Sequence, residues 1–171
     1  MNRPDPSEYA PYYETYVSLI KSDDIESVLR AQLTDMKSLI GSAVGDKETF
    51  RYAPEKWSVR QLVGHVTDSE RIFGYRALAL GRGETAALPA FDETLYMANS
   101  PFAGITLTEI WSELESLRQA NILMVHKFRP EDWARVGVAN NNRASTRAIT
   151  YVLAGHAQHH MNVLKERYLS S

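Results

Sequence analysis

The histidines are the residues of this sequence whose type and spacing could do chemistry. The 171-residue chain has five of them, and His156 and His160 lie four residues apart in a segment with helical periodicity. At about 100° per residue, these two imidazoles fall within roughly 40° of each other, on the apolar face that also carries Ile149 and Leu153. Two neutral imidazoles one turn apart can bind one divalent ion, and zinc, nickel, copper and iron all accept this ligand.

A catalytic metal site usually has three protein ligands and an open position. His65 is the candidate third ligand, because it lies mid-way along another helical segment at the border of its apolar arc. Buried histidines are also found without metals, so the spacing alone leaves an ordinary core role open. His126 comes near the end of a helical segment, where a positive charge is favourable. His159 is expected to be a surface or supporting group.

Four further polar residues are candidates for supporting roles. Gln61 and Asp68 project about 40° and 60° from His65 on the same helix, so either could hydrogen-bond the ring nitrogen that does not bind metal. Asp92 and Glu93 lie in a long connection and could supply a general base at the mouth of the site. The alternative for both is that they are exposed loop acids.

Other polar and aromatic residues are expected to form ion pairs, meet a substrate or pack against the helices. Glu70 projects about 140° from His65, which favours an ion pair over contact with the metal. Arg118 lies among apolar positions of its segment, where it would meet an anionic substrate group or form a surface salt bridge. The tyrosines near the N-terminus are expected to pack that segment against the helices: Tyr9, Tyr12, Tyr13 and Tyr16.

Four segments with helical periodicity must position these residues, and almost nothing alternates as a strand would. They cover about 22–41, 58–80, 106–128 and 145–168. Capping boxes are predicted at Ser58 with Gln61 and at Thr106 with Glu109. The fold class is therefore all-α, a four-helix bundle. About two dozen residues separate the second and third helices, enough to cross the bundle, so we expect up-down-down-up order with a long crossover between them.

Composition narrows the class of protein. The chain has no cysteine, which excludes disulfides, thiolate metal sites and a cysteine nucleophile. Its 19 basic and 21 acidic residues are mixed along the sequence, so we expect no nucleic-acid partner. No apolar stretch is long enough for a membrane span and no signal sequence is evident, which predicts a cytoplasmic protein with no membrane partner. We expect one domain over 1–171, with 1–21 as an N-terminal extension packed on the bundle.

Three motifs in order resemble the DinB/YfiT-like superfamily. Residues 57–70 follow its pattern W-S-x-x-(Q/E)-x-x-x-H-x-x-D-x-E, and residues 154–160 follow its closing G-H-x-x-H-H. Residues 88–93 (LPAFDE) are similar to the proline, phenylalanine and acidic loop between its second and third helices. The resemblance covers nearly the whole chain. One departure is the run 140–143 (NNNR), where many relatives have a glycine-bearing turn before the last helix.

The resemblance implies a DinB-like bundle in which His65, His156 and His160 hold one divalent transition metal ion, zinc or nickel ahead of manganese or iron. Such proteins include thiol-dependent transferases and isomerases, so it implies a small-molecule substrate and a metal site that activates water or a low-molecular-weight thiol. Hydrolase and thiol S-transferase activity both stay open. The resemblance also implies a homodimer. The rival interpretation is a non-catalytic metal-binding or protein-interaction bundle.

Overall fold

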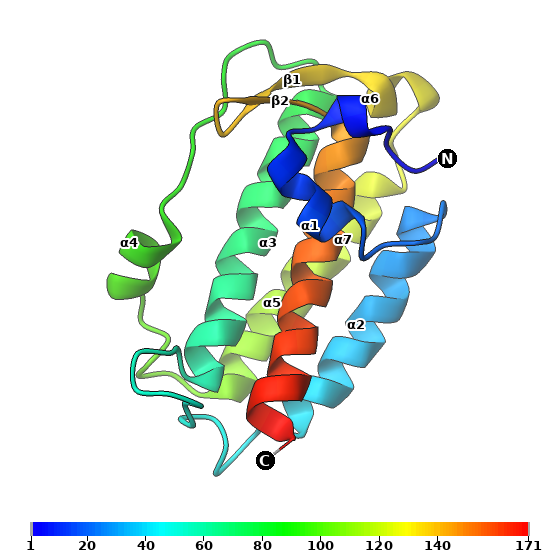
Figure 1. The fold of residues 1–171 in the computed structure, drawn as a ribbon. Helices are drawn as coiled ribbons and strands as arrows, with labels where there is room; N and C mark the ends of the chain where they lie inside the picture. The colour runs from blue at the N-terminus through cyan, green and yellow to red at the C-terminus, as the bar shows by residue number, and fades with distance from the viewer. Residues whose placement is uncertain (1, 171) are drawn as a thin grey trace.

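The computed structural model describes residues 2–170 and has a bundle of four long helices at its core (Figure 1). These helices are α2 (Ile25–Gly41), α3 (Val59–Gly81), α5 (Leu107–Val125) and α7 (Thr146–Val163), the last continued by a π-helical turn, η3 (Leu164–Leu169). The all-α four-helix bundle predicted from the sequence is confirmed.

The helices begin where polar side chains satisfy their free backbone amides. Ser58 and Gln61 form a capping box at the start of α3, as predicted, and Thr106 forms another with Glu109 at α5. Asp24 accepts a hydrogen bond from the Ser27 amide at α2, and Ser145 accepts one from the Ala148 amide at α7. Helix starts were therefore predictable to within one to three residues.

The predicted helix order is confirmed as well. In Figure 1, α2 and α7 run from the top of the bundle to the bottom, whereas α3 and α5 run upward. The parallel pair α3 and α5 is possible because residues 82–106 return along the full length of the bundle. This crossover contains the short helix α4 (Glu93–Ala98), which stands outside α3.

The N-terminal segment lies across α7. It has two 3-10 turns, η1 (Pro6–Glu8) and η2 (Pro11–Tyr13), and the single-turn helix α1 (Glu14–Val17). Tyr13 and Val17 are buried in the same apolar cluster as Tyr151 of α7. Gly155 allows the close approach, because a Cβ there would overlap the backbone carbonyl of Tyr16. That 1–171 forms a single domain stays a prediction.

A short hairpin is the main element that the sequence analysis missed. Strands β1 (Val136–Ala139) and β2 (Asn142–Ser145) pair antiparallel, after the short helix α6 (Pro130–Ala134). Asn140 and Asn141 form the turn with φ of 54° and 59°, a left-handed conformation that asparagine tolerates in two-residue turns. Strands of four residues are too short for alternation to be recognised. Leu88 of the crossover hydrogen-bonds to this hairpin.

Arg118 corrects both roles expected for it, because its side chain is fully buried between helices. Its Nε and Nη2 donate to the two carboxylate oxygens of Glu70 at 2.9 and 2.8 Å. Its Nη1 donates to Oε1 of Gln32 at 2.9 Å, and Asn121 donates to Glu70 at 2.8 Å. Arg118 is therefore neither on the surface nor free to meet a substrate, whereas the ion pair expected for Glu70 is present.

Candidate metal centre

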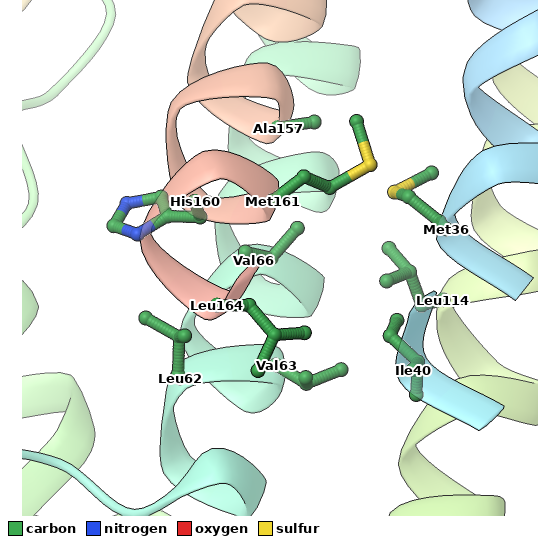
Figure 2. Close-up of a pocket in the computed structure, with 10 residues that line it drawn as sticks. All are labelled: Met36, Ile40, Leu62, Val63, Val66, Leu114, Ala157, His160, Met161 and Leu164. Carbon is green, nitrogen blue, oxygen red and sulfur yellow. The ribbon is translucent and has the colours of Figure 1, made fainter. Parts of the chain in front are cut away.

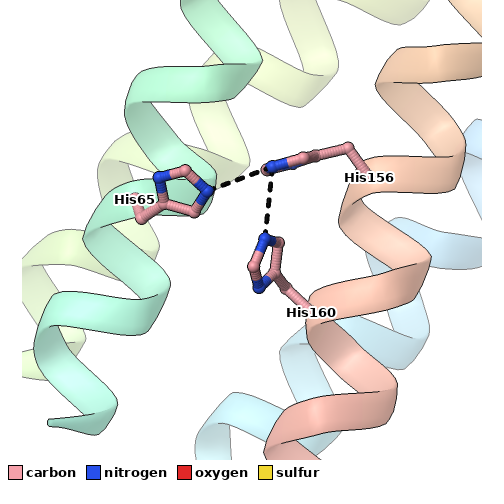
Figure 3. A group of neighbouring side chains, drawn as sticks. All are labelled: His65, His156 and His160. Atoms are coloured by element: carbon pink, nitrogen blue, oxygen red, sulfur yellow. Dashed lines mark hydrogen bonds between the residues drawn. The ribbon is translucent and has the colours of Figure 1, made fainter. Parts of the chain in front are cut away.

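Three imidazoles converge between α3 and α7. His65 points from the second turn of α3, and His156 and His160 point from successive turns of α7 toward it (Figure 3). The Nε2 atom of His156 lies 3.1 Å from Nε2 of His65 and 3.2 Å from Nε2 of His160. The structure thus brings together all three histidines that the sequence analysis singled out, within 4.8 Å of one another.

Neutral histidines cannot satisfy this arrangement. A ring nitrogen carries either one N–H or one lone pair, so Nε2 of His156 can make only one of its two short contacts as a good hydrogen bond. One cation bound by three lone pairs would satisfy both contacts. Ligands about 2.0–2.1 Å from a tetrahedral zinc ion lie about 3.3 Å from each other, close to the separations seen here. The donor set and its spacing therefore fit a divalent metal ion.

Burial keeps these imidazoles in the neutral form that binds metals. His65 and His156 are almost wholly buried, and burial lowers the pKa of His65 to about 4. Burial and the neighbouring imidazoles hold the pKa of His156 and of His160 well below the ordinary value of 6.5. Protons are therefore poor competitors for this site near neutral pH.

Lowering the pH from 7 to 5 is expected to destabilise the metal-free protein. The unfolded chain binds a proton at each histidine near pH 6.5, whereas folded His65 does so only near pH 4. Because the unfolded state then holds more protons, the free energy of unfolding falls as pH drops through this window, by up to about 1.4 kcal/mol per pH unit for one such group. Urea titrations at several pH values measure the slope. His65→Gln should flatten it and exposed His126→Gln should not; equal slopes in both variants would contradict the assignment.

Among the described residues, the expected partners on α3 make no hydrogen bond to the histidines. Gln61 is engaged in the capping box with Ser58. Asp68 faces Arg71 at 3.9 Å, and burial raises the pKa of its carboxyl group. Within residues 2–170, neither donates to nor accepts from His65. A helical projection predicts which residues share a face of the helix. It does not predict that one of them instead forms a helix cap, as Gln61 does, or faces a neighbouring cation, as Asp68 does.

The two loop acids have different roles. Asp92 accepts hydrogen bonds from the amides of Thr94 and Leu95, so it is the N-cap of α4. Glu93 reaches the metal centre, with Oε2 3.9 Å from Nε2 of His65 and a side chain that is 60% exposed. Of the two predicted base candidates, the structure thus places Glu93 beside the histidines and ties Asp92 to the backbone of α4.

Two pockets open onto the histidines from different directions. The first, here the tyrosine pocket, has a volume of about 220 Å³ and includes His156, Glu93 and Asn140, with Tyr12, Tyr13, Tyr16, Phe73 and Phe91. The second, here the tryptophan pocket, has about 330 Å³ and is lined by Trp57, His159, His160 and Tyr168, among others. Each pocket reaches a different histidine of the cluster, so two small molecules could approach it together.

The tyrosines are functional candidates that the sequence analysis treated as packing residues. Tyr16 sets its ring against those of His156 and His159, at centroid distances of 5.3 and 5.9 Å. Tyr12 and Tyr16 bring their hydroxyl oxygens within 3.3 Å of each other. Tyr9 and Tyr13, by contrast, are buried in the core of the protein. Their clustering in 9–16 was visible in the sequence, but nothing there showed which helix they cover.

A third cavity lies beneath the cluster, in the bundle core (Figure 2). It measures about 20 Å³ and is lined by aliphatic side chains and methionines, such as Met36, Leu114 and Met161. The ring of His160 points away from it in Figure 2. A space that barely holds one water and offers it no polar partners is expected to stay dry. Substrate must therefore approach through the outer pockets.

The family model described as the DinB superfamily matches residues 29–164, which include all three histidines. The chain belongs to the DinB superfamily. No curated protein matches its sequence. Among solved structures, this DinB chain is similar to YfiT from Bacillus subtilis, described as a probable metal-dependent hydrolase with an unusual four-helix bundle topology. The TM-score is 0.79 at 16% identity, covering 98% of this chain and 93% of that one, a likeness that shows the fold.

Among residues 2–170, no helix is both long and apolar enough to cross a membrane. The homodimer and the cytoplasmic location stay predictions.

Proposed function

We propose that this DinB protein is a metal-dependent enzyme acting on a small molecule, with His65, His156 and His160 as ligands of one divalent ion. The observation that carries the proposal is the convergence of three Nε2 atoms, two on buried histidines and one on the half-buried His160, which no arrangement of neutral histidines satisfies. When bound, such an ion supplies Lewis-acid activation of water or of a thiol. Zinc and nickel are the first candidates, because both suit imidazole ligands. Iron, which imidazole also suits, and manganese are the next.

Glu93 is the residue proposed to take the proton from the attacking group. It is the first residue of α4, and the Asp92 cap fixes where that helix starts. Its carboxylate lies beside His65 at the open side of the cluster and remains accessible. A positioned carboxylate there can accept a proton from water or a thiol and return it to the leaving group.

Hydrolysis is the first reaction class that this arrangement supports, because it needs one organic substrate and water. The printed description of the YfiT structure, a probable metal-dependent hydrolase, supports the same class. Thiol transfer is the second candidate, and the two pockets favour it, since they could admit two molecules to one centre. Because the chain has no cysteine, the thiol would have to be a small molecule.

Glu93→Gln is expected to lower the turnover number by roughly 10²–10⁴-fold while leaving metal content unchanged, the range typical of a lost general base. The zinc- and nickel-loaded proteins would be assayed on ester, amide and thiol-transfer panels. Asp92→Asn is the matched control, because asparagine keeps an oxygen that can cap α4. Full activity in Glu93→Gln would remove Glu93 from the mechanism. A loaded wild-type protein inert on every panel would favour the alternative, a non-catalytic metal-binding or interaction bundle.

A further inference from the structure

A second arginine is buried in this protein and, unlike Arg118, it has no carboxylate partner among residues 2–170. The side chain of Arg76, on α3, is only 2% exposed. Its Nη2 donates to the backbone oxygen of Pro89 at 2.7 Å. Within the described part of the chain, no acidic side chain pairs with it; the titratable groups that act on its charge are the phenols of Tyr13 and Tyr96.

Placing a cation in such surroundings is costly without a compensating charge. The rings of Phe73 and Phe91 lie 5.6 and 5.7 Å from the Arg76 guanidinium carbon and offset part of that cost. The cost is visible in the pKa of Arg76, which burial lowers from its ordinary value. A charge kept in this position without a counter-ion is well suited to receive one from outside.

The location of the guanidinium says what kind of ligand could supply that charge. Arg76 lines the tyrosine pocket together with Phe73, Phe91 and His156. Its remaining nitrogens make no hydrogen bond to any residue that the structure describes, yet they are not sealed from solvent. The same pocket thus joins an unpaired planar cation, aromatic walls and the edge of the metal centre.

We propose that Arg76 binds the carboxylate or phosphate group of a small organic anion, which makes that anion the substrate class of this enzyme. An aromatic part of this anion would pack against the rings of Phe73 and Phe91, and the reacting group of the anion would face His156. A guanidinium suits this role, because it can donate two parallel hydrogen bonds to a planar or tetrahedral oxyanion. The inference rests on the proposed function for its catalytic meaning, but the binding itself does not require the metal.

Glu93 sets the orientation of such a ligand. It is the acid that shares the pocket, and its carboxylate lies at the histidine end, 3.9 Å from His65. An anionic group would be repelled by this carboxylate and attracted to the Arg76 guanidinium. The pocket therefore offers one charge of each sign, and this favours binding with the anionic group on Arg76.

Calorimetric titration with three probes tests the proposal: 3-phenylpropanoate, phenyl phosphate and the neutral 3-phenylpropanamide. The expected result for metal-free wild-type protein is that at least one anion binds about tenfold tighter than the amide. Whichever anion binds tighter identifies the group that is recognised. Arg76→Gln should reduce the preference to parity, and Arg76→Lys should keep part of it. Arg82→Gln is the matched control. Arg82 caps the C-terminal end of α3 and also lies over an aromatic ring, that of Phe128, but it is exposed to solvent.

Repeating the titrations with zinc-loaded protein separates this proposal from the proposed function. Anion binding that needs zinc and survives Arg76→Gln would mean that the ion itself holds the anion, and would overturn the role of Arg76. Equal affinity for amide and anions, or no binding at millimolar concentration, would overturn it as well. Should the protein fail to bind zinc at all, the metal-free titrations still report on Arg76. Circular dichroism of each variant identifies one that has not folded, in which case Arg76→Lys and the wild-type preference decide.

Discussion

Replacing His156 with alanine is expected to weaken zinc binding by more than about 100-fold. Loss of a group that merely orients a metal ligand typically costs 10–100-fold in affinity, and loss of a ligand should cost more. His156 should have the largest effect of the three, because its Nε2 is the atom that lies within 3.2 Å of both other Nε2 atoms. Competition titration against a zinc chelator, with metal content by plasma mass spectrometry, measures the change.

His126→Ala is the control for this experiment. That histidine is exposed, and its Nδ1 lies 3.1 Å from a carboxylate oxygen of Glu26, so its ring is engaged away from the other three. It should retain about one ion per chain, whereas His65→Ala and His160→Ala should lose it, as His156→Ala does. Wild-type affinity in His156→Ala would show that the ion, if bound, has other ligands. No ion in the wild-type protein, after reconstitution with zinc, nickel or manganese, would make these three ordinary buried histidines.

Glu70→Ala is expected to destabilise the protein by about 3–5 kcal/mol, the usual cost of breaking a buried ion pair. The variant leaves the fully buried guanidinium of Arg118 without its anion. It also disrupts a network across the bundle, since Arg118 bonds to Gln32 of α2, which in turn donates to the backbone oxygen of Ala154 in α7 at 2.9 Å. Urea denaturation followed by circular dichroism gives the change in the free energy of unfolding.

The same two helices offer a matched comparison on their outer surface. Arg71 of α3 pairs there with Glu113 of α5, and both side chains are about two-fifths exposed. Glu113→Ala should therefore cost less than about 1 kcal/mol. The double variant Glu70→Leu with Arg118→Met should recover much of the loss, because two apolar groups leave no charge buried alone. If Glu70→Ala and Glu113→Ala cost the same, burial does not determine the strength of these pairs.

The helices were predictable because their signals are local. Capping residues and apolar periodicity act within a few positions, so Ser58 and Thr106 mark helix starts whatever packs against them. The meeting of His65 with His156 and His160 was predictable for another reason: each lies on or beside an apolar face, and in a four-helix bundle such faces turn inward. The family resemblance pointed to the same residues independently.

What the sequence could not predict depends on which neighbour each element meets. Glu70 and Arg118 are 48 positions apart. The length of the crossover predicted that α3 and α5 run parallel, but it did not show which of their side chains face each other. The role of Tyr16 depends on where a segment without periodicity settles on α7. Gln61 and Asp68 lie on the same side of α3 as His65, but Gln61 hydrogen-bonds to Ser58 and Asp68 faces Arg71 instead. Sequence patterns give directions of side chains, whereas their partners are a property of the packed molecule.

Gly155 helps to set the width of the tyrosine pocket, although it is not one of the residues that line the pocket. It immediately precedes His156, and the backbone of Tyr16 occupies the space where a side chain at 155 would stand. Because glycine has no side chain, the segment that carries Tyr16 can lie directly against the backbone of α7, close to the histidines. A larger residue at position 155 would move the whole segment that carries Tyr16 away from α7. The size of molecule that the pocket admits thus depends partly on a residue of α7 that the molecule does not touch.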